Sequence, residues 1–219
     1  MKKLLNIGQS DFKNVIQNNN YFVDKSLFIE EFINSQSSVM LFPRPRRFGK
    51  TLNLSMLKHF FDKNQTDNYK LFTDLAIWKT SDEVKKHCGK YPVIFLSFKD
   101  AKAKTWENTL GYLKAEIVKV YLQHIYLLES EVLFSFEKEK YNKILSEAAN
   151  EADFGVSLNL LSNYLYRYHN QKVVILIDEY DTPIHAGYGT FYNEVVSFMR
   201  NFLSGAFKDN PNVYKGAIT

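Results

Sequence analysis

Arg44-Pro45-Arg46-Arg47-Phe48-Gly49-Lys50-Thr51 joins two segments of different hydrophobic periodicity. Before this octapeptide, residues 38–42 form a short apolar run of strand length, and Pro43 and Pro45 prevent a strand or helix from continuing to Gly49. After it, apolar residues recur on one face of a helix that begins near Lys50: Leu52, Met56, Leu57, Phe60 and Phe61. The segment therefore predicts a strand, a loop and a helix, in that order.

The loop between these two elements matches most of a phosphate-binding motif. A P-loop has Gly, four free positions, Gly, Lys and Ser or Thr, because backbone N–H groups wrap the phosphates while the Lys and the hydroxyl meet phosphate and Mg²⁺. Gly49, Lys50 and Thr51 fit, whereas Arg44 replaces the first glycine, so the loop has to turn differently. Three of the five arginines of the chain lie here: Arg44, Arg46 and Arg47. We expect phosphate binding at the N-terminus of the helix, and a charged surface loop is the alternative.

A second motif follows the strongest strand signal in the chain, Val173-Val174-Ile175-Leu176-Ile177. Asp178 and Glu179 come directly after it, and acids at the carboxyl end of a buried parallel strand lie where α/β sheets bind ligands. We expect Asp178 to hold Mg²⁺ through its water and Glu179 to orient and polarise the attacking water. This pattern favours hydrolysis over kinase chemistry, and a solvated turn is the alternative.

Two further polar residues follow these acids. For Asp181, a capping or hydrogen-bonding role and a catalytic role are equally open. His185 has no second ligand at a metal-binding spacing, so we interpret it as a surface residue.

Strand and helix patterns alternate along the rest of the chain. Residues 91–98 predict a buried strand, and three stretches predict helices: 106–128, 131–150 and 158–168. Asp24 is expected to cap a helix over 25–33, and Asp100 to cap a helix after the second strand. This order predicts an α/β fold, a three-layer sandwich with a parallel central sheet. The expected single domain over 1–219 has four parts: an N-terminal segment 1–36, a P-loop strand-loop-helix 37–62, a helical insertion about 103–155, and the acidic strand 172–178.

Composition narrows the function classes. The net charge of +4 is too small to require a nucleic-acid partner. Cys88 is the one cysteine, so an intramolecular disulfide and a thiolate zinc site are excluded, and an inert thiol in a reducing compartment is expected. Polar residues interrupt the apolar run that a signal peptide would need at the start of the chain. No stretch of 18 consecutive apolar residues occurs, so no membrane span is expected. A cytoplasmic protein without membrane spans is the expectation.

The motifs together resemble a known family. Arg44-Pro45-Arg46-Arg47-Phe48-Gly49-Lys50-Thr51-Leu52-Asn53-Leu54-Ser55-Met56-Leu57 closely resembles the signature of the predicted AAA-ATPase-like family, P-loop ATPases whose members often carry a C-terminal PD-(D/E)xK nuclease-like domain. The arginine in place of the first glycine is usual in that family. The resemblance continues through Ser10-Asp11-Phe12, Tyr21-Phe22-Val23-Asp24-Lys25, Gly89-Lys90-Tyr91-Pro92-Val93 and Leu176-Ile177-Asp178-Glu179-Tyr180-Asp181-Thr182-Pro183, and so spans nearly the whole chain.

This resemblance implies a role for each candidate residue. ATP and Mg²⁺ are the implied cofactors, with Glu179 and Lys50 catalytic, and with Thr51 and Asp178 at the metal. The implied nucleotide-binding loop is Arg44, Arg46, Arg47, Phe48, Gly49, Lys50, Thr51 and Leu52. Residues 21–25 are implied to border the adenine.

The last residues, 212–219, resemble the start of a sensor strand, which in such ATPases lies between the P-loop strand and the Asp-Glu strand. In such ATPases, the tip of the sensor strand carries polar groups near the γ-phosphate. Because the sequence stops there, we expect a truncated core with the P-loop strand at a sheet edge. The first hypothesis is Mg²⁺-dependent ATP hydrolysis that drives or regulates a missing C-terminal effector. The alternative is a truncated, non-catalytic remnant or interaction module that keeps the fold. The expected partners are nucleotide, a possible homo-oligomer, and nucleic acid only through the missing effector.

Overall fold

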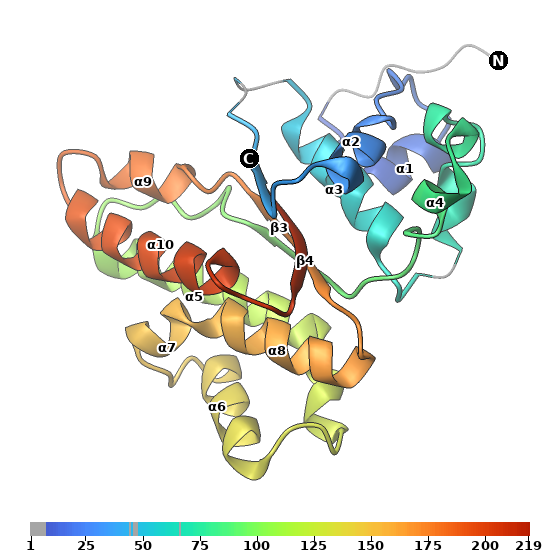
Figure 1. Ribbon diagram of the computed structural model, residues 1–219. Coiled ribbons are helices and arrows are strands. Elements are labelled where there is room, and N and C mark those ends of the chain that lie inside the picture. The colour runs from blue at the N-terminus through green and yellow to red at the C-terminus, as the bar shows by residue number, and fades with distance from the viewer. Residues whose placement is uncertain (1–7, 44, 46–47, 66) are drawn as a thin grey trace.

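The computed structural model describes residues 8–43, 45, 48–65 and 67–219 (Figure 1). Its sheet consists of four parallel strands: β1 (Val39–Leu41), β2 (Val93–Ser97), β3 (Val173–Asp178) and β4 (Val213–Ile218). They pair in the order β1-β4-β3-β2. The final strand therefore lies between the P-loop strand and the Asp-Glu strand, as predicted, and within the described residues β1 pairs with β4 alone.

One face of the sheet is covered by the first helices of the chain (Figure 1). They are α1 (Phe12–Gln17), α2 (Phe28–Asn34), α3 (Lys50–Phe61) and α4 (Asp82–Lys85), with 3₁₀ turns at Asn68–Leu71 and Ala76–Lys79. Val174 and Leu176 of β3 pack into this layer. Because alternate side chains of a strand point to opposite faces, the neighbouring residues of β3 pack into the other layer.

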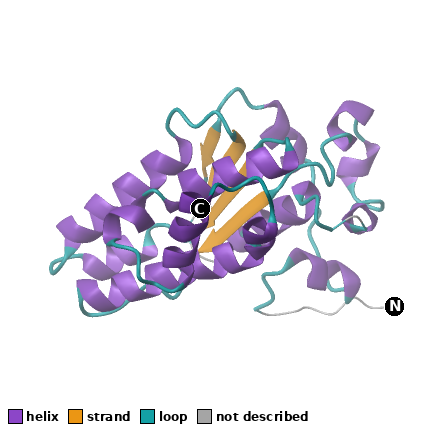
Figure 2. Ribbon diagram, turned by 90° about the horizontal axis from the view of Figure 1, so that it is seen from below, coloured by secondary structure: helices purple, strands orange, loops and turns teal. Residues whose placement is uncertain are grey.

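That second layer consists mainly of helices from the long connection between β2 and β3. It comprises α5 (Trp106–Gln123), a 3₁₀ turn (Ile125–Glu129), α6 (Ser135–Leu145), α7 (Glu151–Gly155), α8 (Ser157–His169) and α10 (Tyr192–Phe207). Ile175 and Ile177 of β3 pack against it. The short α9 (Thr182–Gly187) follows the acidic motif. Figure 2 shows the sheet between the helical layers, which confirms the three-layer α/β sandwich. No helix of the described ranges is long and apolar enough to cross a membrane.

Several predicted boundaries are wrong, each for a local reason. The helix expected to reach residue 128 ends at Gln123, because the chain tightens there into a 3₁₀ turn that keeps the apolar spacing. The helix expected over 131–150 forms at Ser135–Leu145. Asp24 does not cap α2, because its carboxylate accepts hydrogen bonds from the backbone N–H groups of Ser26 and Ala76. Thr105, and not Asp100, caps α5, accepting from the N–H of Asn108. The boundaries of the four expected parts of the domain stay predictions.

Gly216 of β4 lies against the ring of Phe207, the last residue of α10. A Cβ at this position would lie 2.9 Å from Cδ1 of Phe207 and closer still to Cε1. We expect Gly216→Ala to lower the free energy of unfolding by about 1–3 kcal/mol, the usual cost of overpacking. Urea unfolding measures this loss against the wild type. Gly111→Ala is the control and should not lose stability, because a Cβ at Gly111 of α5 has no neighbour within 4 Å and alanine favours a helix. Equal stability of Gly216→Ala and the wild type would show that Phe207 does not constrain this strand.

Candidate nucleotide site

Gly49 shapes the start of the site. It precedes α3 as its N-cap with a φ of 75°, a left-handed conformation that glycine adopts without steric cost. Lys50 and Thr51 then form the first helical turn, which contains no acidic residue. The first N–H groups of a helix have no partner within it and carry a partial positive charge, so this turn is suited to an anion.

Asp178 is held at the carboxyl end of β3 by the tip of β4. Its side chain is buried, and its Oδ1 accepts a hydrogen bond of 2.5 Å from Oγ1 of Thr219, which is also buried. The backbone holds the two residues in register, since the N–H of Thr219 donates to Ile177 at 2.9 Å and the N–H of Tyr180 donates to Thr219 at 3.2 Å. The carboxylate of Asp178 therefore has one fixed orientation at the carboxyl end of the sheet.

Glu179 follows in an uncommon backbone conformation. Its φ of 52° lies in the left-handed region, which costs a non-glycine residue on the order of 1 kcal/mol and recurs at functional sites. Oγ1 of Thr182 donates a hydrogen bond of 3.2 Å to Oε2 of Glu179, so one carboxylate oxygen is held and the other is left for a further partner. The turn thus brings Glu179 out of the buried strand and restrains its side chain.

The two motifs line one cavity of about 680 Å³. Its walls come from three places: residues 8–10, Pro45 with residues 49–52, and the tip of β3 with α9, which gives Glu179, Asp181, Thr182 and His185. Small-molecule sites range over roughly 300–1,000 Å³, so the cavity has the size of such a site. The fold therefore brings Lys50 and Thr51 together with Glu179, although 128 positions (179 − 51) separate Thr51 from Glu179 in the sequence.

The predicted site residues that do not line this cavity lie elsewhere. Asp178 is buried directly before the lining residue Glu179. Phe48 is exposed and lines two neighbouring cavities. Residues 21–23 and Lys25 line one of these, of about 360 Å³, together with Gly49, Leu52 and Asn53. Arg44, Arg46 and Arg47 lie outside the described residues.

Sequence reasoning missed three contributors to the site. His185, interpreted as a surface residue, is exposed but also lines the cavity, and its Nε2 lies 3.4 Å from Oδ2 of Asp181. Their spacing of four residues on a helix was the available signal. Thr182 holds Glu179, and Thr219 holds Asp178. For Thr219, the predicted position at the tip of the sensor strand was the only indication.

The chemistry of a metal at this site follows from the available oxygens. Among the described residues, no three His, Cys, Asp or Glu side chains gather to hold an ion by themselves. Mg²⁺ does not need such a cage, because it commonly takes one or two protein oxygens, several waters and phosphate oxygens. Thr51 and the oriented carboxylate of Asp178 are oxygen donors of that kind.

This fold and cavity define a P-loop NTPase-like α/β domain. The family model described as "Predicted AAA-ATPase" matches residues 6–219, so the chain belongs to the AAA-ATPase-like family. It is also similar to an uncharacterized protein of the vnfD 5′ region of Azotobacter chroococcum mcd 1, with 28% identity over 184 residues. That match covers 84% of this chain and 30% of the relative, so the chain spans less than a third of the relative's length. No solved structure matches the chain.

Proposed function

We propose that this domain binds ATP with Mg²⁺ and hydrolyses it to ADP and phosphate. One observation carries the proposal: a single cavity is lined both by the Gly49-Lys50-Thr51 turn and by Glu179. An anion site and a carboxylate facing the same space are the two parts that hydrolysis of a phosphate anhydride requires. Membership of a predicted ATPase family agrees with this chemistry.

Binding is assigned to the P-loop side of the cavity. The ammonium of Lys50 contacts the β- and γ-phosphates, and the backbone N–H groups at the start of α3 surround them. Arg44, Arg46 and Arg47 add positive charge to the same loop. Thr51 and Asp178 hold the metal side, and the hydrogen bond from Thr219 keeps the Asp178 carboxylate in place. When bound between these residues, Mg²⁺ would supply positive charge that offsets the charge developing on the phosphate.

Hydrolysis is assigned to Glu179. Its free carboxylate oxygen accepts a hydrogen bond from a water molecule and aims the water oxygen at the γ-phosphorus. As the new P–O bond forms, the bond between the γ-phosphorus and the bridging oxygen breaks, and ADP leaves. The proton of the water passes to Glu179 or to the departing phosphate. Because phosphoryl transfer depends mainly on positioning, the hydroxyl of Thr182 contributes by restraining Glu179.

Calorimetric titration with ATP and Mg²⁺ tests the binding step. We expect Lys50→Ala to weaken ATP binding by at least about tenfold, the effect of losing one charge-assisted contact. Lys58→Ala is the matched control, because Lys58 lies in the last turn of the same helix and its Nζ lies over the ring of Phe95. Equal affinities of the wild type and Lys50→Ala would refute the proposal.

The proposal also covers what ATP hydrolysis by this domain would serve. Because the chain spans only part of its relative, we propose that ATP hydrolysis drives or regulates an effector in a longer protein.

Cys88 is mostly buried, and burial raises the pKa of its thiol to about 11, which keeps the thiol protonated and unreactive. An inert, unpaired thiol suits the reducing cytoplasm.

A further inference from the structure

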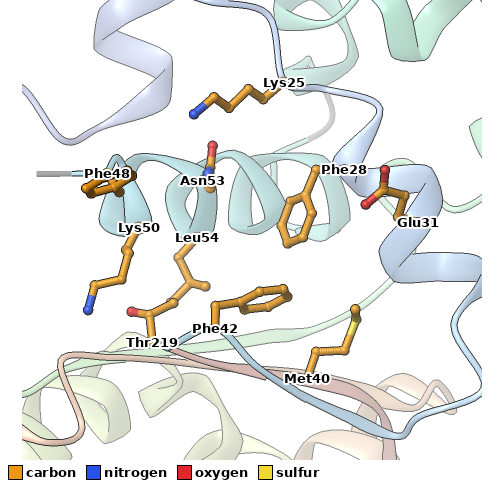
Figure 3. A pocket seen from close by; sticks show the side chains of 10 residues that line it. All are labelled: Lys25, Phe28, Glu31, Met40, Phe42, Phe48, Lys50, Asn53, Leu54 and Thr219. Carbon is orange, nitrogen blue, oxygen red and sulfur yellow. The ribbon is translucent and has the colours of Figure 1, made fainter. Parts of the chain in front are cut away.

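A second cavity adjoins Lys50 on the side of the edge strand β1 (Figure 3). It has a volume of about 330 Å³ and lies between α2, α3 and β1. Figure 3 shows Lys50 and Thr219 at one end, and Phe28, Met40 and Glu31 toward the other, with Phe42 between them. The cavity therefore changes along its length from a cationic end at Lys50 to a mainly apolar, aromatic end that also carries the carboxylate of Glu31.

The strand order fixes the direction in which a bound nucleotide extends. Glu179 follows β3, so the γ-phosphate in the proposed site points toward β3. The P-loop joins β1 to α3, and β1 lies at the edge of the sheet beyond β4. The nucleoside must then leave Lys50 on the side away from β3, which is the side of β1. Met40 belongs to β1, and Phe42 follows it, with its N–H donating to Ile218 at 2.9 Å.

The lining of this cavity suits a flat heteroaromatic ring. Phe28 and Phe42 meet edge to face with ring centroids 5.0 Å apart, and together with Met40 they form a partly buried apolar wall. The carboxylate of Glu31 at the far end disfavours an anion there, so the phosphates belong at Lys50. In the neighbouring 360 Å³ cavity, Tyr21 and Val23 are each 58% exposed. A base would lose less contact with water there.

We infer that the purine base of the nucleotide occupies the cavity between α2, α3 and β1, packed on Phe28, Met40 and Phe42. This inference rests on the proposed function, because it takes the phosphates to lie at Lys50. It assigns binding of the nucleoside to the helix α2 and the edge strand. Lys25 lines both cavities, so of the segment 21–25 it is the residue that faces the nucleoside.

Comparing ATP with inorganic tripolyphosphate separates the base from the phosphates. We expect Phe28→Ala to weaken ATP binding by roughly five- to a hundredfold, as loss of an aromatic contact with a base does. Binding of tripolyphosphate, measured by the same calorimetry with Mg²⁺, should stay unchanged. Met40→Trp fills the cavity instead of opening it and should give the same selective loss. Tyr21→Ala, in the neighbouring cavity, should leave both affinities at the wild-type value.

Each other outcome overturns the inference. Unchanged ATP binding in Phe28→Ala and Met40→Trp would place the base elsewhere, and a selective loss in Tyr21→Ala would place it in the neighbouring cavity. Equal loss of ATP and tripolyphosphate in both variants would show that this wall supports the P-loop and does not bind the base. A wild-type protein that binds neither ligand would refute the proposed function itself, whereas the preceding outcomes leave Lys50-dependent ATP binding intact.

Discussion

Glu179→Gln is expected to lower ATP turnover by about 100- to 10,000-fold, the range that a positioned general base contributes. Glutamine has the same shape, and its amide oxygen can still accept the hydrogen bond from Thr182. It does not carry the negative charge that polarises the water or accepts its proton. ATP affinity should therefore stay within a few-fold of the wild type. Phosphate release measures the turnover, and calorimetry measures the affinity.

Glu194→Gln on α10 provides the control for this experiment, since Glu194 is an acidic residue in the first turn of a helix and lies outside the lining of the cavity. Its turnover should equal that of the wild type. Unchanged turnover in Glu179→Gln would remove Glu179 from the mechanism. A wild-type protein that binds ATP and never releases phosphate would instead favour the non-catalytic alternative.

The free energy of unfolding is expected to fall by about 2–4 kcal/mol between pH 6.5 and pH 4, because buried and partly buried histidines must take up protons. Oη of Tyr126 lies 3.2 Å from Nδ1 of His124 and 2.9 Å from Nε2 of His169. Burial, then the nearby charge of His169, lowers the pKa of His124 to about 4. Burial, then the charge of Lys63, lowers the pKa of His169 to about 4. Burial lowers the pKa of His87 as well.

The direction of this pH dependence follows from the direction of the pKa shifts. The unfolded chain binds protons as the pH falls below 6.5, whereas the folded chain does not until about pH 4, so stability is complete above pH 6.5 and is lost below it. The pKa values of Asp11, Asp24 and Glu137 are lowered, so these carboxylates destabilise the fold only at more acidic pH. The interval from pH 6.5 to pH 5 therefore reports mainly on the histidines.

Urea unfolding at pH 7 and pH 5 measures this difference. His124→Gln should reduce the change in stability between the two pH values, whatever its effect at pH 7. Leu122→Ala is the control, because Leu122 is 50% exposed and has no ionisable group, so the pH dependence should stay as in the wild type. The same pH dependence in His124→Gln and the wild type would show that His124 does not titrate in this interval.

The parts of the structure that the sequence predicts well have strong local signals. The five apolar residues before Asp178 define β3, and the step from Pro45 to the apolar face after Lys50 defines the loop and α3. The position of β4 between β1 and β3 followed from the family resemblance, because spacing along the chain contains no strand order.

What the sequence does not show depends on contacts between distant segments. The hydrogen bond from Thr219 to Asp178 joins residues 41 positions apart. The wall of Phe28, Met40 and Phe42 forms only when α2 packs beside β1, and each residue alone has the pattern of an ordinary core position. Asp24 and Asp100 follow a strong capping rule, yet Asp24 bonds to the distant Ala76, and Thr105 caps α5. A tertiary contact overrides the local capping preference at Asp24, whereas a different local residue, Thr105, caps α5.

The central claim, that the P-loop and the acids at the carboxyl end of β3 form one magnesium-nucleotide site, is tested by measuring ATP affinity with Mg²⁺ and with a chelator. We expect Mg²⁺ to tighten ATP binding by about tenfold or more in the wild type, as one added charged contact does. In Asp178→Asn, which can still accept the hydrogen bond from Thr219, the affinity without Mg²⁺ should stay unchanged and the gain from Mg²⁺ should be lost. A full gain from Mg²⁺ in Asp178→Asn would contradict the claim, because the metal would then bind without this acid.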